Sequence, residues 1–189
     1  DHIAGLFSHG LSRKQKGWDI PTYYVPEESY EPLLGVLRAW ERMSSTVPCV
    51  VKPLRPGAVV DHRNGLEVRA FRAIHTRPSL GYALTRPNHR LKAEFHGLEG
   101  SELVSLKRKG VAIMEDFLDV HLAFCGDTTI DVLKEPLVKN AKALILECTF
   151  LDDELDQREA RKGGHIHIRD IVDHLDELTN DHKTVLFTH

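Results

Sequence analysis

Apolar residues recur at helical spacing in two stretches of this chain. Between Glu27 and Glu41 the repeat predicts an amphipathic helix that starts near Glu31-Pro32, because proline is accepted in the first turn of a helix. A second repeat, between Ile168 and Leu178, predicts a helix with one apolar stripe. The apolar residues of the two repeats are Leu33, Leu34, Leu37 and Trp40, and then Ile168, Ile171, Val172, Leu175 and Leu178.

Shorter apolar runs without helical periodicity predict β-strands. The segment GLEVRAFRAIHT, residues 65–76, has a strand-forming composition and follows a stretch broken by three prolines. Three later runs are almost continuously apolar, a pattern typical of strands buried on both faces of a sheet. These runs are HLAFCGD at 121–127, KALILECTF at 142–150 and KTVLFTH at 183–189.

The alternation of helices with buried strands indicates an α/β fold. Neither an internal repeat nor a low-complexity tract divides the chain, so we expect one layered domain over residues 1–189. The stretch from Leu91 to Gly110 is charged, punctuated by glycine and only weakly periodic. We therefore expect a short irregular arm at about residues 88–116.

Composition narrows the class of protein. Hydrophobic residues make up 41% of the 189 residues and charged residues 28%, as is usual for a globular domain. No apolar run reaches the length of a membrane span, and no signal-peptide pattern opens the chain. Because the net charge is −3, the chain lacks the overall positive charge typical of proteins that bind nucleic acid, and any nucleic acid would bind at a local basic patch.

Cysteine and histidine usage points to metal chemistry without thiolates. The three cysteines are far apart and form no CxxC pair, which argues against a disulfide framework and against a cysteine zinc site. Cys125 and Cys148 are expected to pack in the core as small apolar residues. The 12 histidines make a histidine-ligated metal site worth seeking.

Groups able to bind metal or transfer protons follow the predicted strands. In α/β domains the polar groups beyond the carboxyl ends of strands meet in one crevice. Imidazole nitrogen and carboxylate oxygen together suit Zn²⁺, Mn²⁺ or Fe²⁺ better than Ca²⁺ or Mg²⁺. A single such strand end is more often a solvated cap, but four ends and a terminal Asp-His pair favour a site. The positions are His75, Gly126-Asp127, Glu147-Cys148-Thr149, Thr188-His189 and Asp1-His2.

These segments, taken in order, resemble the motifs of ribonuclease Z, an endonuclease family of the metallo-β-lactamase fold. DHIAGL resembles the second half of the His-x-His-x-Asp-His motif, and the run LKAEFHGLEGSELVSLKRKGVAI resembles the short form in plants and some bacteria. The other segments are AIHTRPSLGYAL, AFCGDTTID, LECTFLDDE, GGHIHI and the final FTH. The resemblance covers nearly the whole chain.

The resemblance implies an αββα sandwich that is incomplete at both termini. The chain begins inside the first metal motif, and the two histidines that precede Asp1 in the family are absent. It stops at His189, the first residue of the last motif. We therefore expect a fragment of a longer protein, which by itself has lost part of the metal site.

The resemblance also implies a ligand set. One metal ion would bind to Asp1, His2, Asp127 and His189. The other would bind to His75, to Asp127 as a bridging ligand, and to the two absent histidines. The cofactor expected from the family is Zn²⁺, two ions per intact subunit, with Mn²⁺ as the alternative. DHIAGL taken alone is also compatible with a disordered terminus.

The implied reaction is attack of a metal-activated water on a phosphodiester. Asp1 would orient this water or accept its proton, and His165 would protonate the leaving 3′ oxygen. Glu147 would hold His165, because a carboxylate partner stabilises the imidazolium form that a general acid needs. The motif register favours His165 over His167, for which a structural or exposed position is expected.

The family implies precursor tRNA as the substrate, a homodimer, no membrane association, and a cytoplasmic location with an organelle as the alternative. Lys107, Arg108 and Lys109 form the densest basic cluster of the chain. They would bind phosphates if they belong to an arm that grips tRNA, although such a cluster is also common in solvated turns.

Three functions follow from these observations. The leading one is a zinc-dependent endoribonuclease that removes the 3′ trailer from precursor tRNA. The second is a broader phosphodiesterase or another hydrolase of the same fold, because one fold hosts many reactions. The third is a catalytically silent RNA-binding fragment, which the incomplete ligand set would produce.

Overall fold

The computed structural model describes residues 3–44, 46–152, 155–179 and 184–188. The expected ligands Asp1, His2 and His189 lie outside the described residues. None of the helices in the described ranges is both long enough and apolar enough to cross a lipid bilayer.

The described residues form seven α-helices, two short 3-10 helices and eight strands. The helices are α1 Gly5–Gln15, α2 Glu27–Met43, η1 Ala93–Phe95, α3 Gly100–Arg108, η2 Ile130–Lys134, α4 Pro136–Lys139, α5 Gln157–Gly163, α6 Ile168–Asp173 and α7 Leu175–Thr179. The strands are β1 Thr22–Pro26, β2 Val50–Leu54, β3 Val59–Arg63, β4 Leu66–Arg72, β5 Leu80–Leu91, β6 Met114–Phe124, β7 Ala143–Glu147 and β8 Thr184–Thr188.

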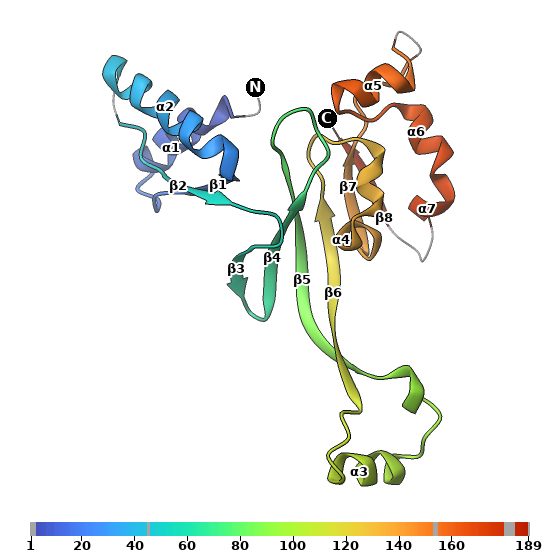
Figure 1. Ribbon diagram of the computed structural model, residues 1–189. Coiled ribbons are helices and arrows are strands. Elements are labelled where there is room, and N and C mark those ends of the chain that lie inside the picture. The colour runs from blue at the N-terminus through green and yellow to red at the C-terminus, as the bar shows by residue number, and fades with distance from the viewer. Residues whose placement is uncertain (1–2, 45, 153–154, 180–183, 189) are drawn as a thin grey trace.

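Six of the strands form one sheet in the order β3-β4-β5-β6-β7-β8. The first four are antiparallel neighbours, whereas β6, β7 and β8 run parallel to one another. Parallel neighbours need crossover connections, and these carry η2 and α4 between β6 and β7, and α5, α6 and α7 between β7 and β8 (Figure 1). The carboxyl ends of the three parallel strands therefore lie at one edge of the sheet.

The main core lies around β6 and β7. Ala123, Cys125, Leu144 and Leu146 are 0–1% exposed, and residues of η2, α4, α6 and α7 pack against them. Cys148 belongs to the same cluster, so both cysteines expected in the core are there. The α/β class predicted from the sequence is confirmed.

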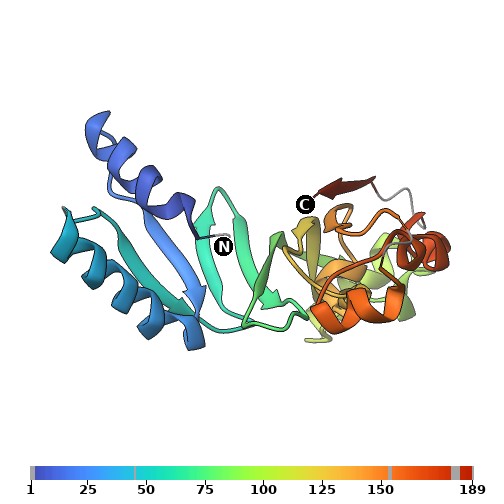
Figure 2. The same cartoon turned by 90° about the horizontal axis from the view of Figure 1, so that it is seen from above.

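A smaller N-terminal unit, residues 5–54, stands beside this sheet. It contains the parallel pair β1-β2 with α1 and α2, and Figures 1 and 2 place it on the opposite side of the hairpin β5-β6 from α5, α6 and α7. Its own core is formed by Leu6, Val25, Leu33, Leu37 and Val47. The sequence patterns predicted neither α1 nor the β1-β2 pair.

Helix α2 begins earlier than the sequence pattern predicted. It starts at Glu27, after the extended residue Pro26, and Pro32 lies inside it on the exposed side. Two glutamates in the first turn favour this start, because their charge interacts well with the helix dipole. Pro32 removes a single backbone hydrogen bond, while Leu33 and Leu37 bury the predicted apolar face.

The predicted strands are present, but one expectation about burial is wrong. Strand β8 was expected to be buried on both faces, yet among the described residues it is the outermost strand of the sheet. Leu186 and Phe187 are 59% and 45% exposed. An apolar run therefore identified the strand, whereas its place in the strand order set how far it is buried.

The apolar stripe at 168–178 belongs to two short helices, not one. Helix α6 ends at Asp173; the next residue, His174, leaves the helical conformation, and its Nδ1 bonds the Asp170 carbonyl oxygen at 2.8 Å. Ile171 and Leu178 are buried, whereas Val172 and Leu175 are 61% and 48% exposed. The break rotates part of the predicted stripe out of the core.

An arm extends from the sheet at the end of the hairpin β5-β6 (Figure 1). The two strands stay paired as far as Leu91 and Met114, and η1 and α3 follow at the tip. This segment is not irregular as predicted, because α3 has a complete capping box in which Glu99 and Glu102 satisfy each other's backbone N–H groups. Helix α3 buries no residue.

Candidate metal centre

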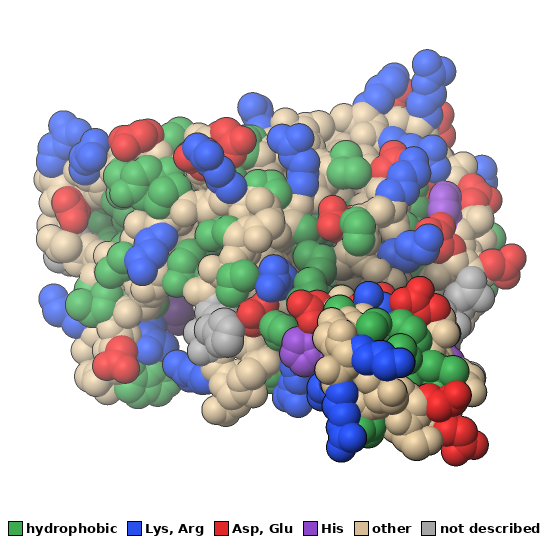
Figure 3. Space-filling view, turned by 60° about the horizontal axis from the view of Figure 1, so that its bottom comes forward, with side chains coloured by type: hydrophobic (Ala, Val, Ile, Leu, Met, Phe, Trp, Pro, Cys, Tyr) green, Lys and Arg blue, Asp and Glu red, His purple; other side chains and the backbone are tan. Residues whose placement is uncertain are grey.

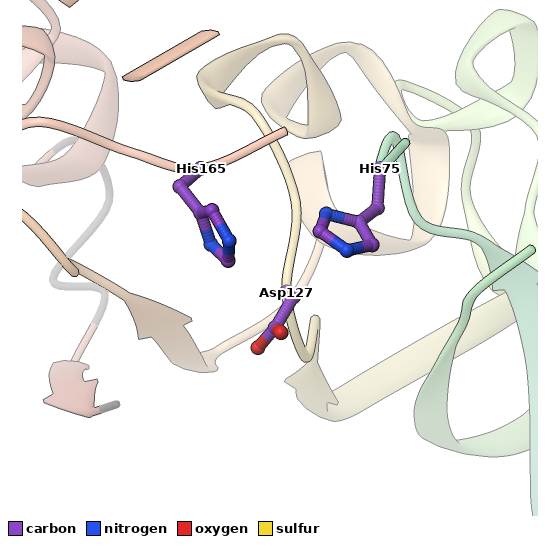
Figure 4. Close-up of side chains that lie close together, drawn as sticks. All are labelled: His75, Asp127 and His165. Atoms are coloured by element: carbon purple, nitrogen blue, oxygen red, sulfur yellow. The ribbon is translucent and has the colours of Figure 1, made fainter. Parts of the chain in front are cut away.

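Three side chains with metal-binding atoms meet at the edge of the sheet. His75, Asp127 and His165 place one potential ligand atom each within 4.8 Å of the others. They come from three separate segments, and Figure 4 shows the two imidazole rings on either side of the carboxylate. The sequence predicted that His75, Asp127 and Glu147 would converge as strand-end groups, and His165 joins them from the loop after α5.

The loop that carries His75 is attached to the loop that carries Asp127. The Ile74 N–H donates to Thr128 Oγ1 at 2.9 Å, and the Thr129 N–H donates to the Ile74 carbonyl oxygen at 2.8 Å. Thr128 is fully buried. These bonds set the spacing between the two ligand-bearing loops.

A glycine directs Asp127 out of strand β6. Gly126 has a φ of +60°, a conformation that other residues adopt only with strain. The chain turns there, immediately after β6, and Thr128 then donates its backbone N–H to Glu147 Oε1 at 2.7 Å. The carboxylate of Asp127 is thereby held beside the end of β7.

Glu147 is a buried carboxylate that organises the centre. It is 2% exposed and accepts hydrogen bonds at both oxygens. Four donors satisfy it, because a buried carboxylate is unfavourable without such partners. They are Thr128 N at 2.7 Å, Thr149 Oγ1 at 2.5 Å, His165 Nδ1 at 3.0 Å and Ile166 N at 3.3 Å.

Both imidazole rings donate away from the cluster. His165 Nδ1 bonds the Glu147 carboxylate, and His75 Nδ1 lies 3.1 Å from the Gly164 carbonyl oxygen. Because carboxylate and carbonyl oxygens only accept, Nδ1 carries the proton in both rings, and Nε2 is the atom with a lone pair. Histidines that bind metals are usually held by partners of these two kinds.

Gly164 allows the two histidine segments to approach each other. A Cβ atom there would lie 2.4 Å from His75 Nδ1 and 2.8 Å from the Thr76 nitrogen, and the residue has a φ of +88°. The rings of His75 and His165 consequently pack edge to face with centroids 5.0 Å apart. Sequence reasoning named the segment GGHIHI but missed this role of its second glycine.

Cys148 lies next to Glu147 but is not prepared to bind metal as a thiolate. Burial raises the pKa of its thiol, and the neighbouring carboxylate of Glu147 raises it further. The thiol therefore stays protonated at neutral pH, in agreement with its expected role in the core. The candidate ligands among the described residues are imidazole and carboxylate groups.

His167 is structural, as expected. It is 1% exposed, and its side chain caps α6 by accepting the Arg169 N–H at Nδ1. Its Nε2 lies 2.8 Å from the Asp152 carbonyl oxygen. Both nitrogens are thus occupied in local bonds, which separates it from the metal-binding group.

The centre opens into a pocket of about 860 Å³. His75, Asp127 and Glu147 line it on the sheet side, and residues of the N-terminal unit line the other side. The Tyr82 hydroxyl donates to the Tyr24 carbonyl oxygen at 3.4 Å, a contact that joins the sheet to β1 at this pocket. The N-terminal unit thus supplies one wall of the site.

The predicted basic cluster lies far from the metal-binding group. Lys107 and Arg108 end α3, and Lys109 follows at the tip of the arm (Figure 1). Figure 3 views the molecule with the arm brought forward, and basic and acidic side chains both cover that end. The structure therefore separates these three residues from the candidate centre.

Comparison with known proteins relates the chain to tRNase Z proteins of plants. No protein-family model matches the sequence. The chain is 36% identical over its whole length to tRNase Z TRZ1 of Arabidopsis thaliana, and it spans 68% of that protein. It is 33% identical to the chloroplastic tRNase Z TRZ2 of the same plant and spans 54% of it.

Two solved structures share the fold. All of this chain matches 60% of the metallo-beta-lactamase fold protein YhfI from Bacillus subtilis, with a TM-score of 0.56 and 14% identity. A match covering 97% of this chain and 64% of human tRNase Z, short form, has a TM-score of 0.54 and 17% identity. The expected metallo-β-lactamase fold is therefore confirmed.

Proposed function

This chain belongs to the tRNase Z family, and on that premise we propose that the protein is a metal-dependent endoribonuclease that removes the 3′ trailer from precursor tRNA. The observation that supports this proposal best is the convergence of His75, Asp127 and His165 around a buried, fully bonded Glu147. This arrangement joins metal-binding groups to a positioned proton donor.

The donor atoms fit a borderline divalent cation. The His75 imidazole and the Asp127 carboxylate suit Zn²⁺, with Mn²⁺ as the alternative, and the Gly164 carbonyl oxygen is the hydrogen-bond partner that fixes the His75 ring. We assign His75 and Asp127 as ligands, and propose that Asp1, His2 and His189 would also hold the metal. When bound, the metal supplies Lewis acidity and activates the attacking water.

The protein itself positions the group that protonates the leaving oxygen. His165 donates Nδ1–H to Glu147, so a second proton on Nε2 can be passed to the 3′ oxygen as it leaves. Thr149 Oγ1, 3.3 Å from His165 Nδ1, is a second polar contact that holds the ring. We assign His165 as the general acid and Glu147 as its positioning residue.

The arm is the proposed contact for the body of the tRNA. Lys107, Arg108 and Lys109 sit at the opposite end of the hairpin from the metal-binding group (Figure 1). Phosphates of a folded RNA can be neutralised there without disturbing the centre.

Because the arm points away from its own site, we also propose a homodimer in which the arm of one subunit serves the site of the other. Light scattering after size-exclusion chromatography would test this oligomeric state.

Cleavage of two substrates tests the proposed function. We expect a 3′-extended tRNA to be cut at one position, leaving a 3′-hydroxyl on the tRNA and a 5′-phosphate on the trailer, and metal chelation to abolish the reaction. An aryl phosphodiester of low molecular weight serves as the comparison. Fast cleavage of the aryl ester without trailer removal would instead identify a broader phosphodiesterase, and tRNA binding without turnover would identify a silent binding fragment.

A further inference from the structure

A single basic side chain other than histidine lines the pocket beside the metal-binding group. Arg77 lies two residues after His75, in the loop between β4 and β5, and its side chain is exposed to this pocket. Among the described residues that line the pocket there is no other lysine or arginine. Nothing in the function proposed above uses this arginine.

Hydrogen bonds of the loop fix the backbone of Arg77 and leave its guanidinium available to a ligand. Ser79 Oγ donates to the Arg77 carbonyl oxygen at 3.1 Å, and the Ala73 N–H donates to the Ser79 carbonyl oxygen at 3.3 Å. Pro78 restricts the backbone between them. Within the part of the chain that the structure describes, no carboxylate forms an ion pair with the Arg77 guanidinium.

Apolar side chains form another part of the same pocket. Val36 of α2 is 47% exposed and Phe124 at the end of β6 is 42% exposed, and both line the pocket together with Leu80. Exposed apolar groups beside carboxylates and an arginine form a surface that matches an amphiphilic ligand. A nucleotide has this character, since its base presents an apolar face and its phosphate carries the charge.

We propose that this pocket is a nucleotide subsite, in which Arg77 binds the phosphate next to the scissile one and the apolar wall of Val36, Leu80 and Phe124 receives the base. The inference rests on the proposed function. An RNA strand whose scissile phosphate lies at His75 and Asp127 must run through the pocket that these residues line. Arg77 offsets the repulsion between the neighbouring phosphate and the carboxylates of Asp127 and Glu147.

Equilibrium binding tests the role of Arg77 without relying on turnover. We would measure fluorescence anisotropy of a labelled single-stranded RNA in the presence of a chelator, over a series of salt concentrations. Arg77→Ala is expected to weaken binding about tenfold at low salt, because a charged hydrogen bond is lost. The slope of log K against log salt should become shallower by about 0.7, the value for one contact with a single strand.

Two variants control for net charge and for geometry. Arg72→Ala removes the same charge from an exposed residue at the end of β4 that does not line the pocket, and it should leave both quantities unchanged. Arg77→Lys should retain the salt slope. Equal losses in Arg72→Ala and Arg77→Ala, no loss in Arg77→Ala, or no RNA binding by the wild-type protein would each overturn the proposal.

A change in the RNA tests the apolar wall without any risk of misfolding. An abasic nucleotide placed on either side of the scissile bond should weaken binding several-fold at one of the two positions, since stacking on apolar groups is lost. Unchanged binding at both positions would refute the base-binding part. Trailer cleavage by the wild-type protein, measured separately, shows whether the proposed function holds when the subsite fails.

Discussion

The two ends of the hairpin β5-β6 differ in what holds them. In the half of β5 from Leu80 to Thr85, every second residue is buried against the core, and the loops that carry the candidate metal ligands lie at this end. In the half from Arg86 to Arg90 every residue is exposed, and the arm with α3 lies beyond it. One pair of strands thus joins a tightly packed region to a solvated one.

The end of the hairpin at Leu80–Thr85, here called the packed end, can fix side chains. The end beyond Arg86 that carries the arm, here called the free end, cannot. Ala83 and Thr85 are 0% exposed, so their neighbours restrict them, whereas the distal half is held by backbone pairing and by surface contacts. These contacts are a hydrogen bond between His89 and Asp116 and an ion pair between Arg90 and Glu115, and an exposed ion pair stabilises by at most about 1 kcal/mol. Catalysis requires positioned groups, whereas electrostatic contact with a large RNA tolerates mobility.

The largest effect is expected from a substitution at the packed end. Asp127→Ala should release the bound metal and slow trailer cleavage at least about a hundredfold, since even residues that only support a ligand have effects of 10–100-fold. Elemental analysis after dialysis would give zinc per chain, with circular dichroism to verify folding. Asp116→Ala, an exposed aspartate in the distal half of β6, is the matched control and should keep both metal and activity.

His165 and His75 should separate catalysis from metal binding. His165→Ala should retain metal and slow trailer cleavage by about 10²–10⁴-fold, the range for loss of a general acid. An aryl phosphodiester should be affected far less, because its leaving group needs no protonation. His75→Ala should lose metal. Loss of metal in His165→Ala would instead make His165 a ligand and refute its assignment as the general acid.

Alanine substitutions at two adjacent glycines, Gly163 and Gly164, test whether the close approach of the segment carrying Gly164 to His75 is required for stability. Gly164→Ala should lower the free energy of unfolding by about 1–3 kcal/mol and reduce cleavage, because a Cβ would collide with His75 and the backbone has a positive φ. Gly163→Ala is the control, since its Cβ would have no contact closer than 3.7 Å and alanine favours the end of α5. Urea unfolding measures both, and equal stability of the two variants would contradict the close-approach argument.

The smallest effect is expected at the free end. Replacing Lys107, Arg108 and Lys109 together with alanine should weaken tRNA binding about tenfold at low salt and make the salt slope shallower by about one per lost phosphate contact. The melting temperature and aryl phosphodiester cleavage should not change, because α3 buries no residue. Exchanging lysine and arginine at these positions keeps the charges and should preserve affinity. Unchanged tRNA affinity in the alanine variant would remove the arm from the binding surface.

Local pattern predicted the strands better than the helices. The apolar runs located β4, β7, β8 and the last four residues of β6, because extended apolar segments are recognisable within a few residues, whereas no such run located β3 or β5. Helix boundaries were less accurate: α2 starts at Glu27 despite Pro32, and the stripe at 168–178 divides at His174. The N-terminal pair β1-β2 was missed because Val25 and Leu33 acquire their burial only when α2 packs over the strands.

By itself the sequence determined the α/β class, the strands that lead to His75, Asp127 and Glu147, and the family resemblance, because each depends on residues near one another in the chain. Tertiary structure alone decided that β8 is the outermost strand among the described residues, that Glu147 holds His165, and that Gly164 meets His75 across 89 positions of sequence. The reason is physical: hydrophobic periodicity acts over a few residues, whereas strand order and loop contacts are set by the packing of distant segments.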